Sequence, residues 1–141
     1  MYRNEEHYAD PTFAAAYAKI KKDMAKNNGD TYMPWVYIAS PLRGDIDRNI
    51  EKAKDYSRFA IKKNTVPMCP HIYFTLFLRD GNEVERRIGM LLGLQMLKRC
   101  KEVWVFGSTI SEGMANEIRI AEKRHIPVRY FTEDCEEVTK K

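Results

Sequence analysis

Several features that would mark a membrane-bound or disulfide-bonded protein are missing from this sequence of 141 residues. Its longest apolar stretch, Ile88 to Leu97, contains two glycines and a glutamine and is shorter than the roughly 20 apolar residues that span a bilayer. The amino end has no apolar core followed by small residues, so it does not look like a signal peptide. The cysteines Cys69, Cys100 and Cys135 form no C-x-x-C pair, which favours free thiols in a reducing compartment. We therefore expect a cytoplasmic protein without membrane contact.

Patterns for metals and nucleic acids are equally scarce. Cys69 and His71 are close enough in sequence to share a metal, but no second pair completes a set of ligands. The net charge is +4, and acidic residues are interleaved with the lysines, so no concentrated basic stripe marks a nucleic-acid binder. We expect no metal, no cofactor and no nucleic-acid partner. The small positive excess suits a phosphorylated small ligand.

What is present suits one globular domain with two additions. The apolar share of 44% and the charged share of 31% are ordinary for such a domain. We expect a helical extension over residues 1–33, a nucleotide-binding α/β domain over 34–131, and a frayed acidic and basic tail over 132–141. In the extension, Asp10 and Pro11 are typical of a helix start, and helical spacing continues to Lys26.

Short apolar runs alternate with helical patterns inside the α/β domain. Strands are expected at 35–39, 65–68, 102–106 and 127–131, and helices at 45–60, 83–99 and 111–123. Runs 35–39 and 102–106 lack alternation, which is typical of strands buried on both faces, whereas Pro67 indicates an edge strand. This order predicts an α/β fold of the flavodoxin- or Rossmann-like class, with a doubly wound, mainly parallel sheet and an extra N-terminal helix.

The helix expected over 83–99 has more apolar surface than one domain can bury. Its inner face is predicted to carry Val84, Ile88, Leu91, Leu92 and Gln95. Gly89 and Gly93 flatten one side for close packing, and Met90, Leu94 and Leu97 lie on another side. We therefore expect a homo-oligomer, a dimer or larger, with this helix in the contact. The alternative is that the N-terminal helix folds back over it.

In doubly wound sheets, ligands bind beyond the carboxyl ends of the strands, so two loops deserve most weight. The first, Ser40 to Asp45, leads into a helix start, where free N–H groups suit an anion and Arg43 adds a charged fork. An ordinary turn capped by Asp45 is an equally good interpretation. The second loop, Gly107 to Gly113, contains Thr109 and Glu112, which are predicted to form a capping box.

Glu117 is the best candidate for chemistry. In a helix it shares the inward stripe with Met114, Ile118 and Ala121, and a carboxylate facing the crevice suits a nucleophile or a base. The alternative is a glutamate at the surface edge, favoured by the helix dipole. Taken alone, His71 is a structural histidine. The aromatic residues Tyr37, Tyr73, Phe74, Phe77 and Trp104 are expected in the core.

Several of these segments together resemble the nucleoside 2-deoxyribosyltransferase-like superfamily. They are Tyr37-Ile-Ala-Ser-Pro-Leu-Arg-Gly44, Pro70-His71, Cys100–Gly107 and Ser111-Glu-Gly-Met-Ala-Asn-Glu-Ile118, with Ala121 and Ile126-Pro-Val128. The likeness is greatest to a small uncharacterised branch that is common in phage and prophage genomes. It extends to the 2′-deoxynucleoside 5′-monophosphate N-glycosidases.

The resemblance implies cleavage or exchange of the N-glycosidic bond of a (deoxy)nucleoside 5′-phosphate. It makes Glu117 the nucleophile on the anomeric carbon and Tyr37 the residue that orients it. Arg43 and Gly44 match a phosphate-binding turn, and Ser111 matches a serine that touches the phosphate from a neighbouring subunit. The remaining candidates for ligand binding are Ser40, Asp45, His71, Gly107, Ser108, Gly113 and Met114.

Two departures from the family pattern support a second hypothesis. Ser40-Pro41 replaces a glycine-serine pair, which removes one backbone donor. The catalytic enzymes also carry an aspartate on the helix before the third strand, whereas Gly89–Met96 contains no acid, which leaves Glu112 for acid–base duty. The second hypothesis is a non-catalytic nucleotide-binding protein that sequesters or senses a nucleotide-derived signal. A phage-encoded protein is one form of this hypothesis. A third is a small oligomeric interaction module without a working pocket.

Overall fold

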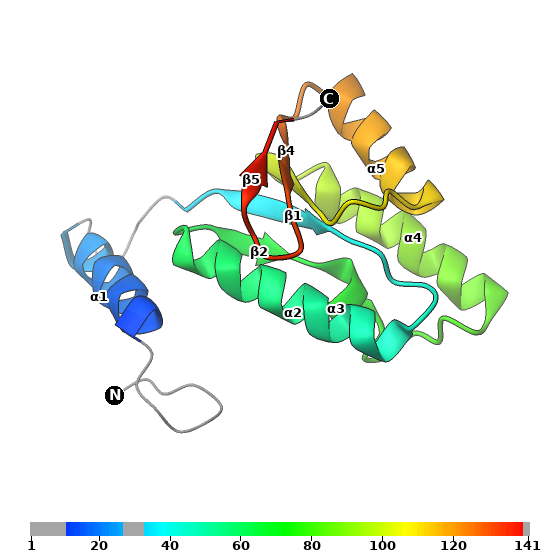
Figure 1. Cartoon of the computed structure of the whole chain (residues 1–141), viewed down its shortest axis with the longest axis horizontal. Helices are drawn as coiled ribbons and strands as arrows, with labels where there is room; N and C mark the ends of the chain where they lie inside the picture. Colours follow the sequence, from blue (N-terminus) through cyan, green and yellow to red (C-terminus); the bar gives the residue numbers. More distant parts are fainter. Residues whose placement is uncertain (1–10, 27–32, 140–141) are drawn as a thin grey trace.

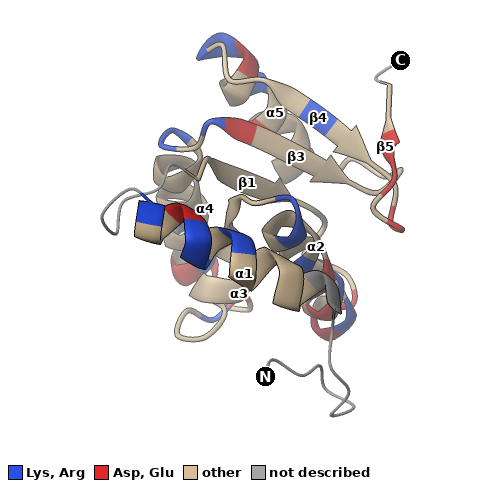
Figure 2. Ribbon diagram, turned by 90° about the vertical axis from the view of Figure 1, so that its left-hand side faces the viewer, with Lys and Arg blue, Asp and Glu red and all other residues tan. Residues whose placement is uncertain are grey.

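A computed structural model describes residues 11–26 and 33–139 as a five-stranded sheet with flanking helices. The strands are β1 (Trp35–Ala39), β2 (Val66–Met68), β3 (Glu102–Phe106), β4 (Val128–Phe131) and β5 (Glu137–Val138). Their order is β2-β1-β3-β4-β5, and only the pairing of β5 with β4 is antiparallel. Figure 2 shows β1, β3 and β4 pointing the same way. This confirms the flavodoxin-like, mainly parallel α/β fold, with β2 at an edge.

The helices cover the two faces of the sheet unequally (Figure 1). Helix α2 (Ile46–Lys62) packs on one face, whereas α4 (Glu83–Leu97) and α5 (Glu112–Lys123) cover the other. The short helix α3 (Pro70–Phe74) joins β2 to the segment before α4. Alternate side chains of β1 point to opposite layers: Val36 and Ile38 toward α2, Tyr37 and Ala39 toward α4 and α5. Within the described ranges, no helix is long and apolar enough to cross a membrane.

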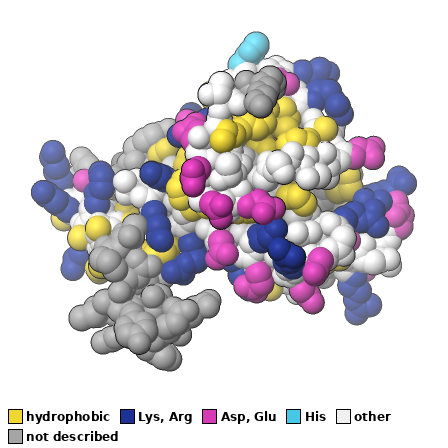
Figure 3. Space-filling view, in the orientation of Figure 1, with side chains coloured by type: hydrophobic (Ala, Val, Ile, Leu, Met, Phe, Trp, Pro, Cys, Tyr) yellow, Lys and Arg dark blue, Asp and Glu magenta, His cyan; other side chains and the backbone are white. Residues whose placement is uncertain are grey.

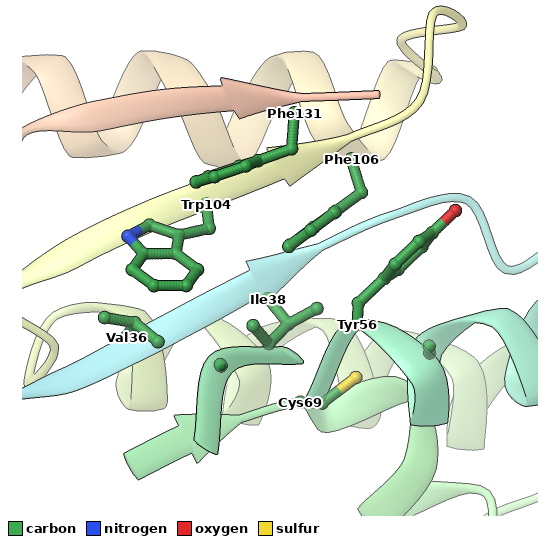
Figure 4. Close-up of a cluster of buried hydrophobic side chains, with 9 residues drawn as sticks. Val36, Ile38, Tyr56, Cys69, Trp104, Phe106 and Phe131 are labelled. Atoms are coloured by element: carbon green, nitrogen blue, oxygen red, sulfur yellow. The ribbon is translucent and has the colours of Figure 1, made fainter. Parts of the chain in front are cut away.

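An aromatic cluster fills the layer between the sheet and α2 (Figure 4). The Phe106 ring stacks on Tyr56 at 4.2 Å and on Phe131 at 5.0 Å between centroids. Trp104 is buried as predicted, and its indole N–H donates to Glu102 at 2.8 Å. Burial of each such ring stabilises the fold by roughly 1.5–3 kcal/mol. The carboxyl end of β3 is therefore a firm base for the loop that follows it.

Helix α4 presents a different face to the sheet from the one predicted. Gly93 and Leu97 are its buried residues, whereas Val84 and Leu91 are 66% and 64% exposed. The predicted inner face of Val84, Ile88, Leu91, Leu92 and Gln95 is therefore wrong. The reason is the close approach that glycine allows, which brings the backbone at Gly93 against Pro70.

Part of the predicted aromatic core is also at the surface. Tyr73 and Phe77 are 54% and 55% exposed, and with Phe74 they pack mainly on one another, with centroids 5.1–5.8 Å apart. The strand Val66–Met68 ends just before this segment, so the chain has left the sheet before it reaches these rings.

The N-terminal helix α1 (Pro11–Lys26) packs on α2. Phe13 is buried there, with the Arg58 guanidinium 4.3 Å and the Lys62 ammonium 5.0 Å from its ring centroid. The helix is confirmed from Pro11 onward, and the expected cap Asp10 lies outside the described residues. The apolar face of α4 stays exposed, while α1 packs on α2 instead, so the fold-back alternative fails. Figure 3 shows basic side chains around α1 and acidic ones at the centre of the same face.

The C-terminal segment is more ordered than predicted. It turns back after β4 and adds β5 to the sheet. The Arg129 guanidinium donates to both carboxylate oxygens of Glu137, at 2.7 and 2.8 Å, a geometry that makes strong charge-assisted bonds. The prediction of a frayed tail is therefore wrong through Val138. All three cysteines are free.

Candidate functional site

A buried tyrosine and a glutamate form the centre of the site. Strand β1 directs Tyr37, 2% exposed, toward the α4–α5 layer, and α5 brings Glu117 to it from 80 residues further along the chain. The Tyr37 hydroxyl donates a hydrogen bond to Glu117 Oε2. Within the described part of the chain no hydrogen bond reaches Glu117 Oε1, so this oxygen is free to accept one.

Burial changes the acid–base properties of both residues. It raises the pKa of Glu117 to about 7, although the hydrogen bond from Tyr37 acts in the lowering direction. It also raises the pKa of Tyr37 well above its ordinary value of 10.0, assisted by the nearby Glu117 charge. Tyr37 therefore remains a hydrogen-bond donor at neutral pH. Glu117 is divided between its acid and carboxylate forms, which is a suitable state for a nucleophile or a base.

Helix α4 contributes backbone to this site and no acid. A Cβ atom on Gly93 would meet the Tyr37 hydroxyl at 3.5 Å and Pro70 at 3.4 Å. In the ranges that the structure describes, no second carboxyl group is hydrogen-bonded to the Tyr37–Glu117 pair. Among the described residues, the side-chain hydrogen bond to Glu117 therefore comes from Tyr37, and no neighbouring acid assists it.

His71 connects the loop after β2 to the loop after β1. It lies in the first turn of α3, with Nε2 2.7 Å from the carbonyl oxygen of Ser40. Burial lowers the pKa of His71 below 6.5, while the bond to Ser40 and the charge of Asp80 act in the raising direction. The imidazole is therefore neutral at pH 7.

The first loop holds its shape through side-chain contacts and suits an anion. The Asn49 amide donates to the carbonyl oxygens of Leu42 and Arg43 at 2.9 and 3.1 Å, and Gly44 has φ +101°. Asp45 caps α2 by accepting from Arg48 N–H at 3.2 Å, as predicted. Among the described residues, no hydrogen bond occupies the backbone N–H groups of residues 42–47. Free N–H groups at a helix start are typical of anion sites.

Two side chains of the first loop, Arg43 and Ser40, make no close ion pair or hydrogen bond with the rest of the described chain. Arg43 is largely exposed, and its Nε lies 3.9 Å from Asp80 Oδ2. The hydroxyl of Ser40 is buried and has no hydrogen-bond partner in the part of the chain described, an arrangement that costs free energy unless a ligand or water satisfies it.

The second loop begins at Gly107, with φ +96°, and ends at Ser111, which caps α5 by accepting from Met114 N–H at 3.2 Å. The predicted capping box of Thr109 and Glu112 is therefore wrong. Thr109 lies two residues before the cap, and Glu112 is the exposed first residue of the helix. Ser108 and Gly113 are exposed, whereas the Met114 side chain is buried in the core.

The two loops follow β1 and β3, which are neighbours in the sheet, and they enclose a cavity of about 40 Å³ with α2. Glu133, from the β4–β5 turn, closes it through an ion pair with Lys52 at 3.1 Å. The lining residues are Pro41, Asn49, Lys52, Tyr56, Phe106, Gly107, Thr109 and Glu133. Ligand sites usually measure roughly 300–1,000 Å³, so a ligand of ordinary size would extend over the open edge of this cavity.

Sequence reasoning missed Asn49, Lys52 and Glu133. Asn49 and Lys52 lie four and seven residues after the cap Asp45, so helical spacing from that cap was the available signal. Glu133 was assigned to a frayed tail. Nothing in the local sequence indicated that the β4–β5 turn reaches α2.

A larger groove of about 390 Å³ lies toward the amino ends of the strands, on the face that α2 covers. Its charged side chains include Arg129, which pairs with Glu102 and Glu137. These charges already satisfy one another, and the groove lies at the opposite end of the strands from the two loops. Within residues 11–26 and 33–139, no cluster of three or more His, Cys, Asp or Glu side chains could hold a metal ion.

Comparisons with known proteins agree with this fold. The family described as "Domain of unknown function (DUF7768)" matches residues 34–131. A solved 2-deoxyribosyltransferase from the psychrotolerant bacterium Bacillus psychrosaccharolyticus is similar, with 19% identity and a TM-score of 0.53. The similarity covers 70% of this chain and 72% of the other, and it shows a shared fold. No curated protein matches the chain.

Proposed function

The chain belongs to the DUF7768 family, and we propose that it binds a (deoxy)nucleoside 5′-phosphate and cleaves or exchanges its N-glycosidic bond. Glu117 is the nucleophile in this proposal. The observation that carries it is the hydrogen bond from Tyr37 to a half-buried glutamate, together with the N–H groups of residues 42–47, which no hydrogen bond among the described residues occupies. Buried carboxylates with a raised pKa are concentrated at catalytic sites.

The proposed reaction begins with attack of Glu117 Oε1 on the anomeric carbon. The C1′–N bond breaks, its electron pair leaves with the base, and the base takes a proton from solvent or from an acid group. The resulting glycosyl ester is resolved by water, which completes hydrolysis, or by a second base, which completes exchange. Tyr37 holds Oε2 throughout, so that Oε1 is the attacking atom.

Other features support the same ligand. The free N–H groups of residues 42–47 and the Arg43 guanidinium suit a phosphate. The structural neighbour is named a 2-deoxyribosyltransferase and is described as a biocatalyst for nucleoside synthesis. We also propose a cytoplasmic location for the chain, on its free thiols and ordinary composition.

A second function is favoured by one specific observation. No acid stands at Gly93 beside Tyr37, and Glu112 is exposed at the start of α5, so among the described residues acid assistance to the leaving base has no evident source. A non-catalytic protein that sequesters or senses a nucleotide would need the same loops and no second acid.

The deciding experiment is incubation with deoxy- and ribonucleoside 5′-monophosphates of each base, followed by chromatography for free base. Base release by the wild type and none by Glu117→Gln supports the enzyme. Glu112→Gln is the matched control on the same helix, and it should retain release. Recovery of unchanged nucleotide in complex with the protein would support sequestration instead, and absence of any binding would reject both functions.

A further inference from the structure

His71 lies between the two halves of the proposed site. Its chain neighbour Pro70 packs on Gly93, which borders Tyr37. On the other side, His71 itself is bonded to Ser40, the first residue of the loop that carries Arg43. In a nucleotide the rest of the sugar ring, with its hydroxyl groups, lies between the anomeric carbon C1′, which Glu117 would attack, and the 5′-phosphate, which the Arg43 loop would bind. His71 is therefore placed beside the sugar.

The chemistry of the His71 ring follows from its bond to Ser40. A carbonyl oxygen only accepts hydrogen bonds, so the nitrogen 2.7 Å from it, Nε2, must carry the proton. In a neutral imidazole the other nitrogen then has a free electron pair and is an acceptor. In the described residues, no hydrogen-bond donor contacts Nδ1. Such a nitrogen recognises a hydroxyl or an N–H group, and it cannot bind a phosphate oxygen.

We infer that His71 Nδ1 accepts a hydrogen bond from a sugar hydroxyl of the bound nucleotide, and that the Ser40 carbonyl fixes the ring for this purpose. The inference rests on the proposed function, because the order of Glu117, His71 and Arg43 is matched to the order of groups in a nucleotide. It makes His71 a residue of sugar recognition and excludes a role in phosphate binding.

The state of the ring is measurable without a ligand. In ¹⁵N-labelled full-length protein at pH 7, long-range proton–nitrogen spectra should show His71 protonated on Nε2 alone. His71→Asn and His125→Asn identify the signals, and the second is structurally benign because Asn tolerates the φ of +58° at residue 125. A charged ring or a proton on Nδ1 would overturn the inference.

Ligand recognition is tested with 2′-deoxynucleoside 5′-monophosphates of the four bases and their 2′,3′-dideoxy counterparts, which lack the ring hydroxyl. By calorimetry, the wild type should bind the dideoxy compound about three- to tenfold more weakly, the value of one neutral hydrogen bond. His71→Gln places an amide nitrogen near Nε2 and keeps a donor for Ser40, but it lacks the Nδ1 acceptor. It should therefore bind both compounds alike, at the level of the dideoxy compound with wild type.

The control His125→Gln should discriminate between the two compounds as the wild type does. Unchanged discrimination in His71→Gln would overturn this inference and leave the proposed function intact. If neither the four deoxynucleotides nor the matching ribonucleotides bind the wild type, the proposed function is wrong, and the assignment of His71 to the sugar is wrong with it.

Discussion

Gly93 faces the hydroxyl of Tyr37 so closely that a Cβ atom there would lie 3.5 Å from the phenol oxygen. That distance is ordinary van der Waals contact, so a methyl group fits and a larger side chain does not. Helix α4 thus lies against the Tyr37–Glu117 pair because this position has no side chain.

Gly93→Leu should therefore displace Tyr37 and weaken both stability and base release. Overpacking of a core contact costs roughly 1–3 kcal/mol, which is measurable by thermal unfolding. Gly93→Ala is the matched control, because its methyl meets Pro70 at 3.4 Å and removes a glycine from a helix interior, a change worth roughly 0.5–1 kcal/mol in favour of alanine. Equal unfolding temperatures for the leucine variant and the wild type would show that α4 does not pack here.

The pH profile of base release should report Glu117. The nucleophile must be a carboxylate, so with its pKa at about 7 the rate should rise as pH increases through neutrality. In Tyr37→Phe the hydrogen bond that lowers this pKa is lost, and the rising limb should move to higher pH. Activity measured from pH 5 to 9 checks both statements. An unshifted limb in Tyr37→Phe would separate Tyr37 from the ionisation of Glu117.

Because Glu117 is buried, its ionised form should lower the free energy of unfolding at pH values above 7. The folded-state pKa of Glu117, about 7, exceeds its ordinary value of 4.5, so the folded state holds its proton more tightly than the unfolded state. The free energy of unfolding is then largest below pH 4.5 and falls as pH rises to 7, by up to about 3 kcal/mol from this residue. Glu117→Gln, which is uncharged, should unfold at a higher temperature than the wild type at pH 8.

Near pH 4.5 the Glu117→Gln variant and the wild type should unfold at similar temperatures, since both side chains are then mostly neutral. Glu112→Gln serves as the control, because its side chain is exposed at the start of α5. A wild type that is the more stable of the two at pH 8 would contradict the desolvation of Glu117.

The succession of four strands and of the longer helices along the chain could be predicted because buried strands and capped helices leave local patterns. The face of α4 could not, since both of its sides are apolar and the deciding contact, Gly93 against Pro70, joins residues far apart in the sequence. The cap of α5 was missed for a different reason, although the helix itself begins where it was predicted. Both Thr109 and Ser111 are chemically able to cap a helix, and backbone conformation favoured Ser111.

The residues of the candidate site also fall into those that local patterns predicted and those that they did not. Glu117 was identifiable from its inward stripe on α5, and its partner Tyr37 was identified by resemblance alone. Lys52 and Glu133 were missed because their ion pair depends on a turn that no local pattern places over α2.

Arg43→Ala should weaken a nucleotide and leave the matching nucleoside nearly unaffected. A hydrogen bond to a charged group is worth roughly 1.5–3 kcal/mol, and the loose 3.9 Å contact with Asp80 leaves the guanidinium free to turn to a phosphate. Calorimetry with each pair of ligands measures the difference. Arg48→Ala, in the first turn of α2, is the control. Equal losses for nucleotide and nucleoside would place Arg43 away from the phosphate.

The apolar surface of α4 and the segment before it is the expected contact between subunits. We call this the α4 surface, and it consists of Tyr73, Leu76, Phe77, Val84, Ile88, Leu91 and Leu92, which are 42–76% exposed. The α3 helix packs on α4, so these side chains belong to neighbouring segments. At roughly 100 Å² each they approach the ~800 Å² that each partner buries in a stable interface. An uncovered surface of this kind normally marks a partner site.

Light scattering at micromolar concentration should therefore show a dimer or a larger homo-oligomer. Leu91→Glu should shift it toward monomer, because placing an unpaired charge in an apolar contact costs several kcal/mol. Val138→Glu, an exposed apolar site on β5, should leave the assembly unchanged. A chain shortened to begin at Thr31 should also remain oligomeric, since α1 packs on α2 and leaves the α4 surface uncovered. A full-length monomer would contradict the prediction, and an oligomer unaffected by Leu91→Glu would place the contact on another face.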